Sequence, residues 1–291
     1  MNILISADIE GVAGVFHPEQ TRQGNPEYER ARRWMTAEAN AAIEGAFEGG
    51  ATQVHVNDSH GGFRNLLPDL LDSRAQVILG KPRYLGMMAG IDTPCDAVFM
   101  LGYHGRSQSR GVLAHTINSF AFARVWLDDD EVGEAGLYGA LAEEYGAQVV
   151  LLTGDDVLGA ETRERFALAR HVRTKVAAGC NTGSSLTPEA ACRAIREAAT
   201  LATAALAGRL ELAANATSEA NAANAASSKR PVPRVARRCR LQVQTPALAD
   251  LFCQWPTLVR EDGVTLRFDA ACVEDTVRIL NCLSAMSAML R

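Results

Sequence analysis

The first side chains in the chain that could do chemistry together are two carboxylates, Asp8 and Glu10. They follow an apolar run at residues 3–5 that is typical of a buried strand. Side chains alternate along a strand, so two residues two positions apart point the same way, with Cα atoms roughly 6.6 Å apart. Carboxylates placed in this way repel each other and lose water, and one or two divalent cations would compensate for both effects. The alternative left open by this stretch is that both side chains only bond amides of the following loop.

Two histidines occupy similar positions further along the chain. The strand pattern at 52–56 is followed by a polar turn that contains His60, and the strand pattern at 97–101 is followed by a turn that contains His104. In a largely parallel sheet, ligands bind outside the carboxyl ends of the strands. We therefore expect the carboxylate pair and both histidines to meet at one site.

The chemistry of this set favours metal binding. Carboxylate oxygens and imidazole nitrogens are ligands that zinc and similar ions prefer. Glu134, at the start of a helix expected over 134–145, adds a third carboxylate. Five ligands are too few for two closed sites, but they suffice for two open sites that share a carboxylate and a water. Two divalent ions would also offset the charge of three carboxylates and one hydroxide, so we expect a metal pair and, as its usual reaction, hydrolysis.

Each member of the set also has a structural alternative. Asp58 competes with His60 for the role of ligand, and Asp155 competes with Glu134. We expect Asp155 to cap the helix that follows it or to support a ligand. Glu134 could instead complement a helix dipole. Histidines outside these polar turns are expected to be structural, namely His17, His55 and His171.

Strand and helix patterns alternate along most of the chain. Helical patterns cover 27–47, 160–169 and 187–206, a strong strand pattern covers 148–153, and a weaker strand pattern covers 172–176. Such alternation predicts an α/β fold with three layers, in which a largely parallel sheet is flanked by helices.

Changes in composition predict the domain organisation. We expect a metal-binding catalytic α/β domain over 1–208. Residues 213–233 are mostly Ala, Asn and Ser without a hydrophobic face, which predicts a flexible insertion. Residues 234–291 contain two strand and two helix patterns and predict a small C-terminal α/β unit, either joined to the main sheet or beside it.

The overall composition limits the possible partners and the compartment. With 291 residues, 47% of them hydrophobic, the chain can bury a sizeable core. Lys and Arg number 29 against 34 Asp and Glu, so neither nucleic acid nor an anionic membrane surface is an expected partner. No apolar run approaches the length of a membrane span. The seven cysteines form no C-x-x-C pair and no leader is recognisable, so we expect reduced thiols in a cytoplasmic protein.

Five short motifs contain the candidate residues. In chain order they are Asp8-Ile9-Glu10-Gly11, Asn57-Asp58-Ser59-His60-Gly61, Gly102-Tyr103-His104, Ala114-His115-Thr116 and Val132-Gly133-Glu134. As an ordered set, they resemble the zinc-dependent D-aminopeptidase family, peptidase family M55. The similarity covers about residues 1–205 and resumes after the insertion.

The resemblance implies a function, a metal centre and an assembly. It implies two zinc ions per subunit and His115 as the catalytic residue. It also implies that the enzyme removes an N-terminal D-amino acid, typically D-alanine, from short peptides, and that it forms a homodecamer of two five-membered rings around a chamber. The implied zinc ligands are Asp8, Glu10, His60, His104 and Glu134. The chain departs from the family at Asp128-Asp129, where Asn-Gly is usual; this change affects the turn before Glu134.

The sequence leaves other activities open because nothing in it specifies the stereochemistry of the substrate. A dinuclear metal amidase and an L-aminopeptidase use the same chemistry. A non-catalytic ring protein that keeps a structural metal is a further alternative, against which the complete ligand set together with His115 argues.

Overall fold

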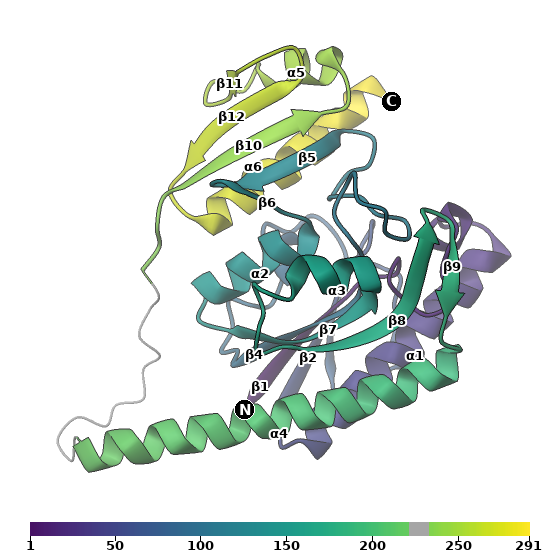
Figure 1. Ribbon diagram of the computed structural model, residues 1–291, viewed down its shortest axis with the longest axis vertical. Helices are drawn as coiled ribbons and strands as arrows, with labels where there is room; N and C mark the ends of the chain where they lie inside the picture. The colour runs from purple at the N-terminus through teal and green to yellow at the C-terminus, as the bar shows by residue number, and fades with distance from the viewer. Residues whose placement is uncertain (221–232) are drawn as a thin grey trace.

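The computed structural model describes residues 1–220 and 233–291 and confirms the α/β fold, with a mostly parallel seven-stranded sheet between helices (Figure 1). The strand order is β3-β2-β1-β4-β7-β8-β9, and only the pairing of β8 with β9 is antiparallel. The strands are β1 (Asn2–Ala7), β2 (Gln53–Asp58), β3 (Gln76–Ile78), β4 (Ala97–Tyr103), β7 (Gln148–Asp155), β8 (Arg170–Gly179) and β9 (Thr182–Ser185).

Helices cover both faces of this sheet. Helices α1 (Pro26–Glu48) and α4 (Pro188–Ala220) lie on one face, and α2 (Glu134–Glu144) and α3 (Asp156–Thr162) lie on the other (Figure 1). Along β1, Ile3 and Ile5 pack into the core beneath α1 and α4, whereas Leu4 packs into the core that contains α2. Burial on both faces explains why this strand is continuously apolar rather than alternating. Short 3₁₀ helices lie in the connections, namely η1 (Pro18–Thr21), η2 (Pro68–Leu70) and η3 (Gly86–Met88), and a further one, η4 (Ser287–Leu290), follows the last α-helix.

A second sheet of five antiparallel strands has the order β11-β12-β10-β5-β6. Strands β10 (Arg237–Val243), β11 (Val259–Arg260) and β12 (Thr265–Ala270) come from the C-terminal region, and helices α5 (Pro246–Phe252) and α6 (Val273–Met286) pack against them. Strands β5 (Phe122–Leu127) and β6 (Asp130–Glu131) come from the middle of the chain.

The predicted C-terminal unit, 234–291, is therefore not self-contained. Two of the strands in its sheet lie within the region predicted as the catalytic domain, 1–208. The physical reason is that β10 has buried side chains, such as Leu241, and needs a hydrogen-bonding partner on each edge; β12 satisfies one edge and β5 the other.

Two helices differ from their predicted bounds. Helix α4 continues to Ala220, because the Ala-rich stretch keeps strong helix formers beyond residue 206. The first part of the predicted insertion 213–233 is thus helical, and 221–232 lie outside the described residues. Helix α3 ends at Thr162, and most of the predicted helix over 160–169 forms turns that bury Phe166 close to Gly139 of α2. Among the described helices, none combines the length and apolarity needed to cross a bilayer.

Candidate metal centre

Three adjacent strands of the main sheet end at one place. The chain runs outward from β1 to β2 and β3 on one side and to β4, β7 and β8 on the other, so the strand order reverses at β1. Asp8 directly follows β1, His104 directly follows β4, and His60 comes two residues after β2. Ligands bind at such reversal points, and the predicted edge of the sheet is confirmed as the meeting place of these residues.

Two glycines allow the loops after β1 and β4 to approach each other. A Cβ atom at Gly11 would lie 1.9 Å from the carbonyl oxygen of Tyr103, and one at Gly102 would lie 2.2 Å from that of Asp8. Gly102 also has a φ of 66°, a conformation that favours glycine. The amide of Gly11 donates to the Gly102 carbonyl at 2.7 Å. Glycines in the two motifs therefore bring the Asp8 and His104 loops into backbone contact.

One half of the site is built around His60. Its Nδ1 lies 3.2 Å from Oδ1 of Asp8 and 3.0 Å from Oε2 of Glu10. Its Nε2 lies 3.0 Å from the carbonyl oxygen of Thr21, to which it can donate. Oε2 of Glu10 is buried and forms no hydrogen bond of acceptable geometry. The Nδ1 atom and two carboxylates thus converge on a point where a cation would satisfy all of them.

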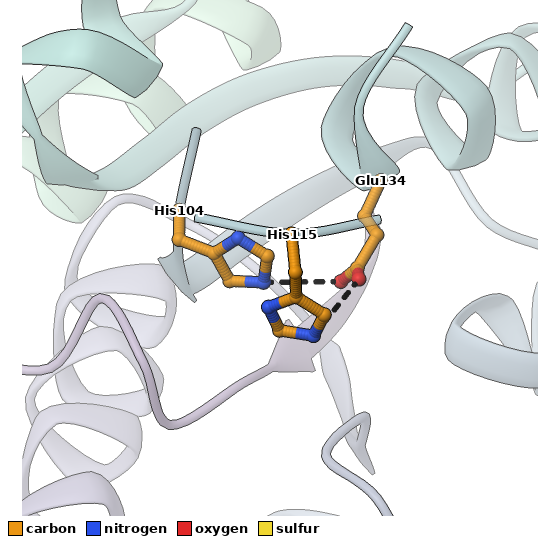
Figure 2. Close-up of side chains that lie close together, drawn as sticks. All are labelled: His104, His115 and Glu134. Carbon is orange, nitrogen blue, oxygen red and sulfur yellow. Dashed lines mark ion pairs between the residues drawn. The ribbon is translucent and has the colours of Figure 1, made fainter. Parts of the chain in front are cut away.

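The other half is built around His104 and Glu134. Nε2 of His104 lies 3.5 Å from Oδ2 of Asp8 and 3.4 Å from Oε2 of Glu134, and this buried nitrogen forms no hydrogen bond. Nδ1 of His104 lies 3.0 Å from the carbonyl oxygen of Gly105. The ring of His115 stacks on that of His104 at 4.2 Å, and its Nε2 lies 3.5 Å from Oε1 of Glu134 (Figure 2).

The three histidines share one arrangement. Each turns one ring nitrogen to a backbone carbonyl and the other to carboxylates; for His115, the carbonyl is that of Leu113, 2.9 Å from Nδ1. Metal-binding histidines use this arrangement to hold the ring and its tautomer. Two donor atoms on a tetrahedral zinc ion are about 3.4 Å apart, close to the 3.0–3.5 Å seen between the facing nitrogen and oxygen atoms.

The donor set fits a cation, and Asp8 is suited to bridge two. Its Oδ1 faces His60 and its Oδ2 faces His104, so its carboxylate joins the two halves. Two overlapping groups have donor atoms that all lie within 4.8 Å of one another. They are Asp8, Glu10 and His104, and His104, His115 and Glu134.

The electrostatics of the site also favour positive charge. Burial alone would lower the pKa of His60, but the charges of Glu10 and Asp8 outweigh it and raise that pKa well above its usual value. For His104, the carboxylates of Glu134 and Asp8 likewise outweigh burial and raise its pKa well above the usual value. Protons would therefore compete for the positions that cations can take, and metal binding would release them.

The pKa values of the three carboxylates shift in different directions because their surroundings differ. Burial and the neighbouring Glu10 raise the pKa of Asp8. Burial opposes ionisation of Glu10 as well, but His60 outweighs it and holds the pKa of Glu10 well below its usual value. His104 does the same for Glu134, whose pKa is lowered despite burial.

Both competing aspartates lie behind the site and support its loops. Asp58 accepts hydrogen bonds from the amides of Leu66, at 2.7 Å, and His60, at 3.3 Å, and so shapes the loop that carries His60. Asp155 caps α3 by accepting from the amide of Leu158 at 2.8 Å, which confirms the predicted cap. It also accepts from the amide of Val112 at 2.7 Å, which anchors the segment leading to His115.

The remaining histidines lie in other surroundings, as expected. His17 caps η1 by accepting from the amide of Glu19, and His55 bonds Gln53 on β2. His171 is an exposed residue of β8.

Sequence reasoning missed two supporting residues. Lys175 of β8 is 1% exposed, and its Nζ donates to the carbonyl oxygens of Glu10 and Val15, the latter at 2.7 Å. Burial lowers the pKa of Lys175 to about 8. Its only sequence signal is a lysine between the apolar residues of a strand. The second supporting residue is Glu161 of α3, which accepts hydrogen bonds from the backbone next to His104 and Glu134. In the sequence it is only a charged residue in a helical pattern.

Comparisons with known proteins agree with this geometry. The model of the M55 peptidase family, described as D-aminopeptidase, matches residues 1–282. The chain belongs to the M55 peptidase family. A D-aminopeptidase of Bacillus subtilis (strain 168) is 33% identical over 197 residues, which cover 68% of this chain and 72% of that protein. The structure of the zinc-dependent D-aminopeptidase DppA from Bacillus subtilis, described as a self-compartmentalizing protease, matches with a TM-score of 0.85 and 25% identity, covering 99% of this chain and 98% of that one.

Family membership confirms the resemblance drawn from the five motifs and makes the protein a hydrolase of the D-aminopeptidase type. The departure from the M55 pattern at Asp128-Asp129 leaves the hairpin intact. Asp128 adopts a φ of 58° in the turn between β5 and β6. Its side chain accepts from the amide of Arg238 at 3.0 Å and pairs with Arg237 at 2.9 Å. The hydrogen bond and the ion pair between β10 and this turn thus stabilise the segment that leads to Glu134.

Proposed function

We propose that this M55 protein is a zinc-dependent aminopeptidase that removes the N-terminal residue, a D-amino acid such as D-alanine, from short peptides at a dinuclear zinc centre. The observation that carries the proposal is that Oε2 of Glu10 and Nε2 of His104, both buried and without a hydrogen bond, lie close to the Asp8 carboxylate. The two oxygens of that carboxylate face His60 and His104. The zinc character of DppA supports the choice of metal. The proposed ligands are Asp8, Glu10, His60, His104 and Glu134.

Bound zinc supplies Lewis acidity toward a peptide carbonyl and lowers the pKa of water. The protein's own part is to hold the donors in place and to move protons. Asp8 faces His60 with one carboxylate oxygen and His104 with the other. The Gly105 and Thr21 carbonyls keep His104 and His60 in the tautomers that leave a free nitrogen facing the carboxylates.

His115 is the proposed catalytic residue. Its side chain is 21% exposed, whereas that of His104 beneath it is 1% exposed, so His115 lies on the solvent side of the cluster. Its Nδ1 donates to the Leu113 carbonyl, which leaves Nε2 free to accept or deliver a proton beside Glu134. Such a group can protonate the leaving amine or donate to the developing oxyanion.

We also propose a cytoplasmic homodecamer of two five-membered rings that encloses the active sites. The description of DppA as self-compartmentalizing supports an enclosed assembly. No disulfide joins any of the cysteines in the described part of the chain, which supports a reducing compartment. Sedimentation velocity should give a mass close to ten times the 31.2 kDa of one chain.

The proposal is tested with purified protein, zinc and three substrates: D-Ala-D-Ala, L-Ala-L-Ala and an acyl amide. We expect release of D-alanine from the first, together with two zinc ions per subunit by elemental analysis. The variant His104→Ala should lose zinc and activity, whereas His171→Ala, on the exposed part of β8, should keep both. Cleavage of the L-peptide alone would replace the D-specific assignment by an L-aminopeptidase. Zinc binding without any hydrolysis would support a non-catalytic metal protein.

A further inference from the structure

A carboxylate outside the site joins two segments that carry site residues. Oε2 of Glu161 accepts a hydrogen bond from the backbone amide of Arg106 at 2.8 Å, and its Oε1 accepts from that of Gly133 at 3.2 Å. Arg106 comes two residues after His104, and Gly133 directly precedes Glu134. A single side chain therefore ties together the backbones on either side of the pair formed by His104 and Glu134.

The two segments are in close contact at this point. A Cβ atom at Gly133 would lie 2.6 Å from Oε1 of Glu161 and 2.9 Å from the Cβ atom of Arg106. The side chain of Arg106 adds a second link, because its Nε lies 3.4 Å from Oε1 of Glu131. No side chain fits at Gly133, and the two hydrogen bonds to Glu161 together with this ion pair hold the segments at their present separation.

The same short helix also holds a third segment. Asp155, at the N-terminal end of α3, accepts from the amide of Val112 at 2.7 Å, three residues before His115. Glu161 lies at the other end of α3. The carboxylates at the two ends of one helix thus anchor the backbones that carry His104, His115 and Glu134, without entering the site themselves.

We propose that Glu161 is a positioning residue that sets the distance between His104 and Glu134, and with it the affinity for the zinc ion that these two residues share. This inference rests on the proposed function. The present separation of 3.4 Å between Nε2 of His104 and Oε2 of Glu134 equals the spacing of about 3.4 Å expected for two ligands on one tetrahedral zinc ion. Without the hydrogen bonds to Glu161, only the ion pair of Arg106 with Glu131 and the loops themselves would set this spacing.

Two substitutions should have graded effects. Glu161→Gln keeps one acceptor oxygen but turns an NH₂ group toward the second amide, so one of the two links is lost. Glu161→Ala removes both links. Outer partners of metal ligands typically contribute 10- to 100-fold to metal affinity, so we expect zinc binding about 10-fold weaker in the glutamine variant and about 100-fold weaker in the alanine variant.

The test is a zinc titration of the metal-free, full-length protein against a chromophoric chelator, with cobalt(II) absorption spectra of the same variants. Glu164→Gln, an exposed position three residues further on with the same change of charge, is the matched control and should behave as the wild type. At least one equivalent of zinc should bind more weakly in both Glu161 variants, with altered cobalt bands. If the alanine variant does not fold, the glutamine variant decides alone.

The results that would contradict the inference differ from those that would contradict the proposed function. Zinc curves and cobalt spectra of the Glu161 variants that superimpose on the wild type would overturn the inference and leave the proposed function intact. The same holds if only the unfolding temperature of the metal-free protein falls while zinc affinity stays unchanged, since that would mark a role in folding alone. A wild-type protein that binds no zinc would overturn both.

Discussion

At the scale of single residues, the histidines of the site owe their direction to backbone carbonyls. The carbonyls belong to Thr21 at the end of η1 and to the loop residues Gly105 and Leu113. A side chain bonds the backbone next to each of them: that of Asn25 next to Thr21, that of Glu161 next to Gly105 and that of Asp155 next to Leu113. Because the rings are anchored in this way, removing one site residue should leave the others in place. Substitutions at the site can therefore separate metal binding from catalysis.

The variant His115→Ala should lose turnover and keep its zinc. General acid–base groups typically contribute about 10² to 10⁴ in rate, so a loss of at least about 100-fold in kcat is expected with D-Ala-D-Ala. Zinc content by elemental analysis should equal that of the wild type, because the five proposed ligands are intact. His171→Ala is the control. Loss of zinc from the variant would instead make His115 a ligand, a role that its position near His104 and Glu134 allows, and full activity would remove it from the mechanism.

A buried glutamate behind the site should make stability depend on pH. Glu38 of α1 is 1% exposed and accepts a hydrogen bond from the amide of Ala13 at 2.9 Å, while its Oε2 has no hydrogen-bonding partner. Burial raises the pKa of Glu38 to about 7, against the opposing effects of the Ala13 amide and the charge of Lys175. Between its unfolded pKa and about 7, the folded protein holds a proton that the unfolded chain has lost, so stability falls as pH rises through this window.

Glu38→Gln removes this titration while keeping an acceptor for Ala13. The gain in free energy of unfolding should grow from under about 1 kcal/mol at pH 5 to about 3 kcal/mol at pH 7.5. Urea unfolding of the wild type and the variant at pH 5 and at pH 7.5 measures this gain. Glu197→Gln, exposed on α4, should show no such trend. An effect of Glu38→Gln that is equal at both pH values would contradict the raised pKa.

At the scale of elements, two glycines allow α1 and α4 to pack at close range. A Cβ atom at Gly45 would lie 2.4 Å from the carbonyl oxygen of Arg196, and one at Gly49 would lie 2.5 Å from that of Thr200. Alanine favours a helix by about 1 kcal/mol over glycine. At this crossing, however, the added methyl group meets backbone, which cannot move as a flexible side chain can.

We therefore expect Gly45→Ala to lower the free energy of unfolding by about 1–3 kcal/mol, the usual range for overpacking. Gly208→Ala, in α4 where a Cβ atom would meet nothing within 4 Å, should raise it by up to about 1 kcal/mol. Urea unfolding of both variants gives the comparison. An equal gain in free energy of unfolding from both substitutions would show that α1 and α4 can move apart without loss of stability.

The elements that carry the site could be predicted because their signals are local. Apolar runs such as 148–153, followed at once by polar turns, mark the strands of a parallel sheet, and the five motifs supply the donors. The pairing of β5 with β10 could not be predicted, because it joins residues more than a hundred positions apart and leaves no local pattern. Lys175 and Glu161 were missed for a similar reason: their partners are backbone atoms of distant loops.

At the scale of the whole molecule, the site lies where the two sheets share a core. Glu134 is the first residue of α2, and α2 packs against β7 of the main sheet and against α6 of the second. Tyr138, one turn further along α2, donates to Asn281 of α6 at 3.1 Å, and Asn118, three residues after His115, donates to the hydroxyl of Ser284 at 3.0 Å. A ligand that binds Glu134 is therefore attached to α2, the helix that packs against both sheets' layers through β7 and α6.

Zinc should therefore stabilise the protein as a whole rather than its loops alone. A ligand that binds only the folded state at 100 times its Kd adds about 2.7 kcal/mol per site, which for a chain of this length corresponds to a rise in Tm of about 5 °C or more. Differential scanning calorimetry of the metal-free and zinc-loaded protein measures it, and both sheets should unfold in a single transition that moves together. The Tm of His104→Ala should shift much less, because His104 belongs to both groups of close donor atoms. If zinc moves only part of a split transition, the two sheets unfold independently and the shared core does not couple them.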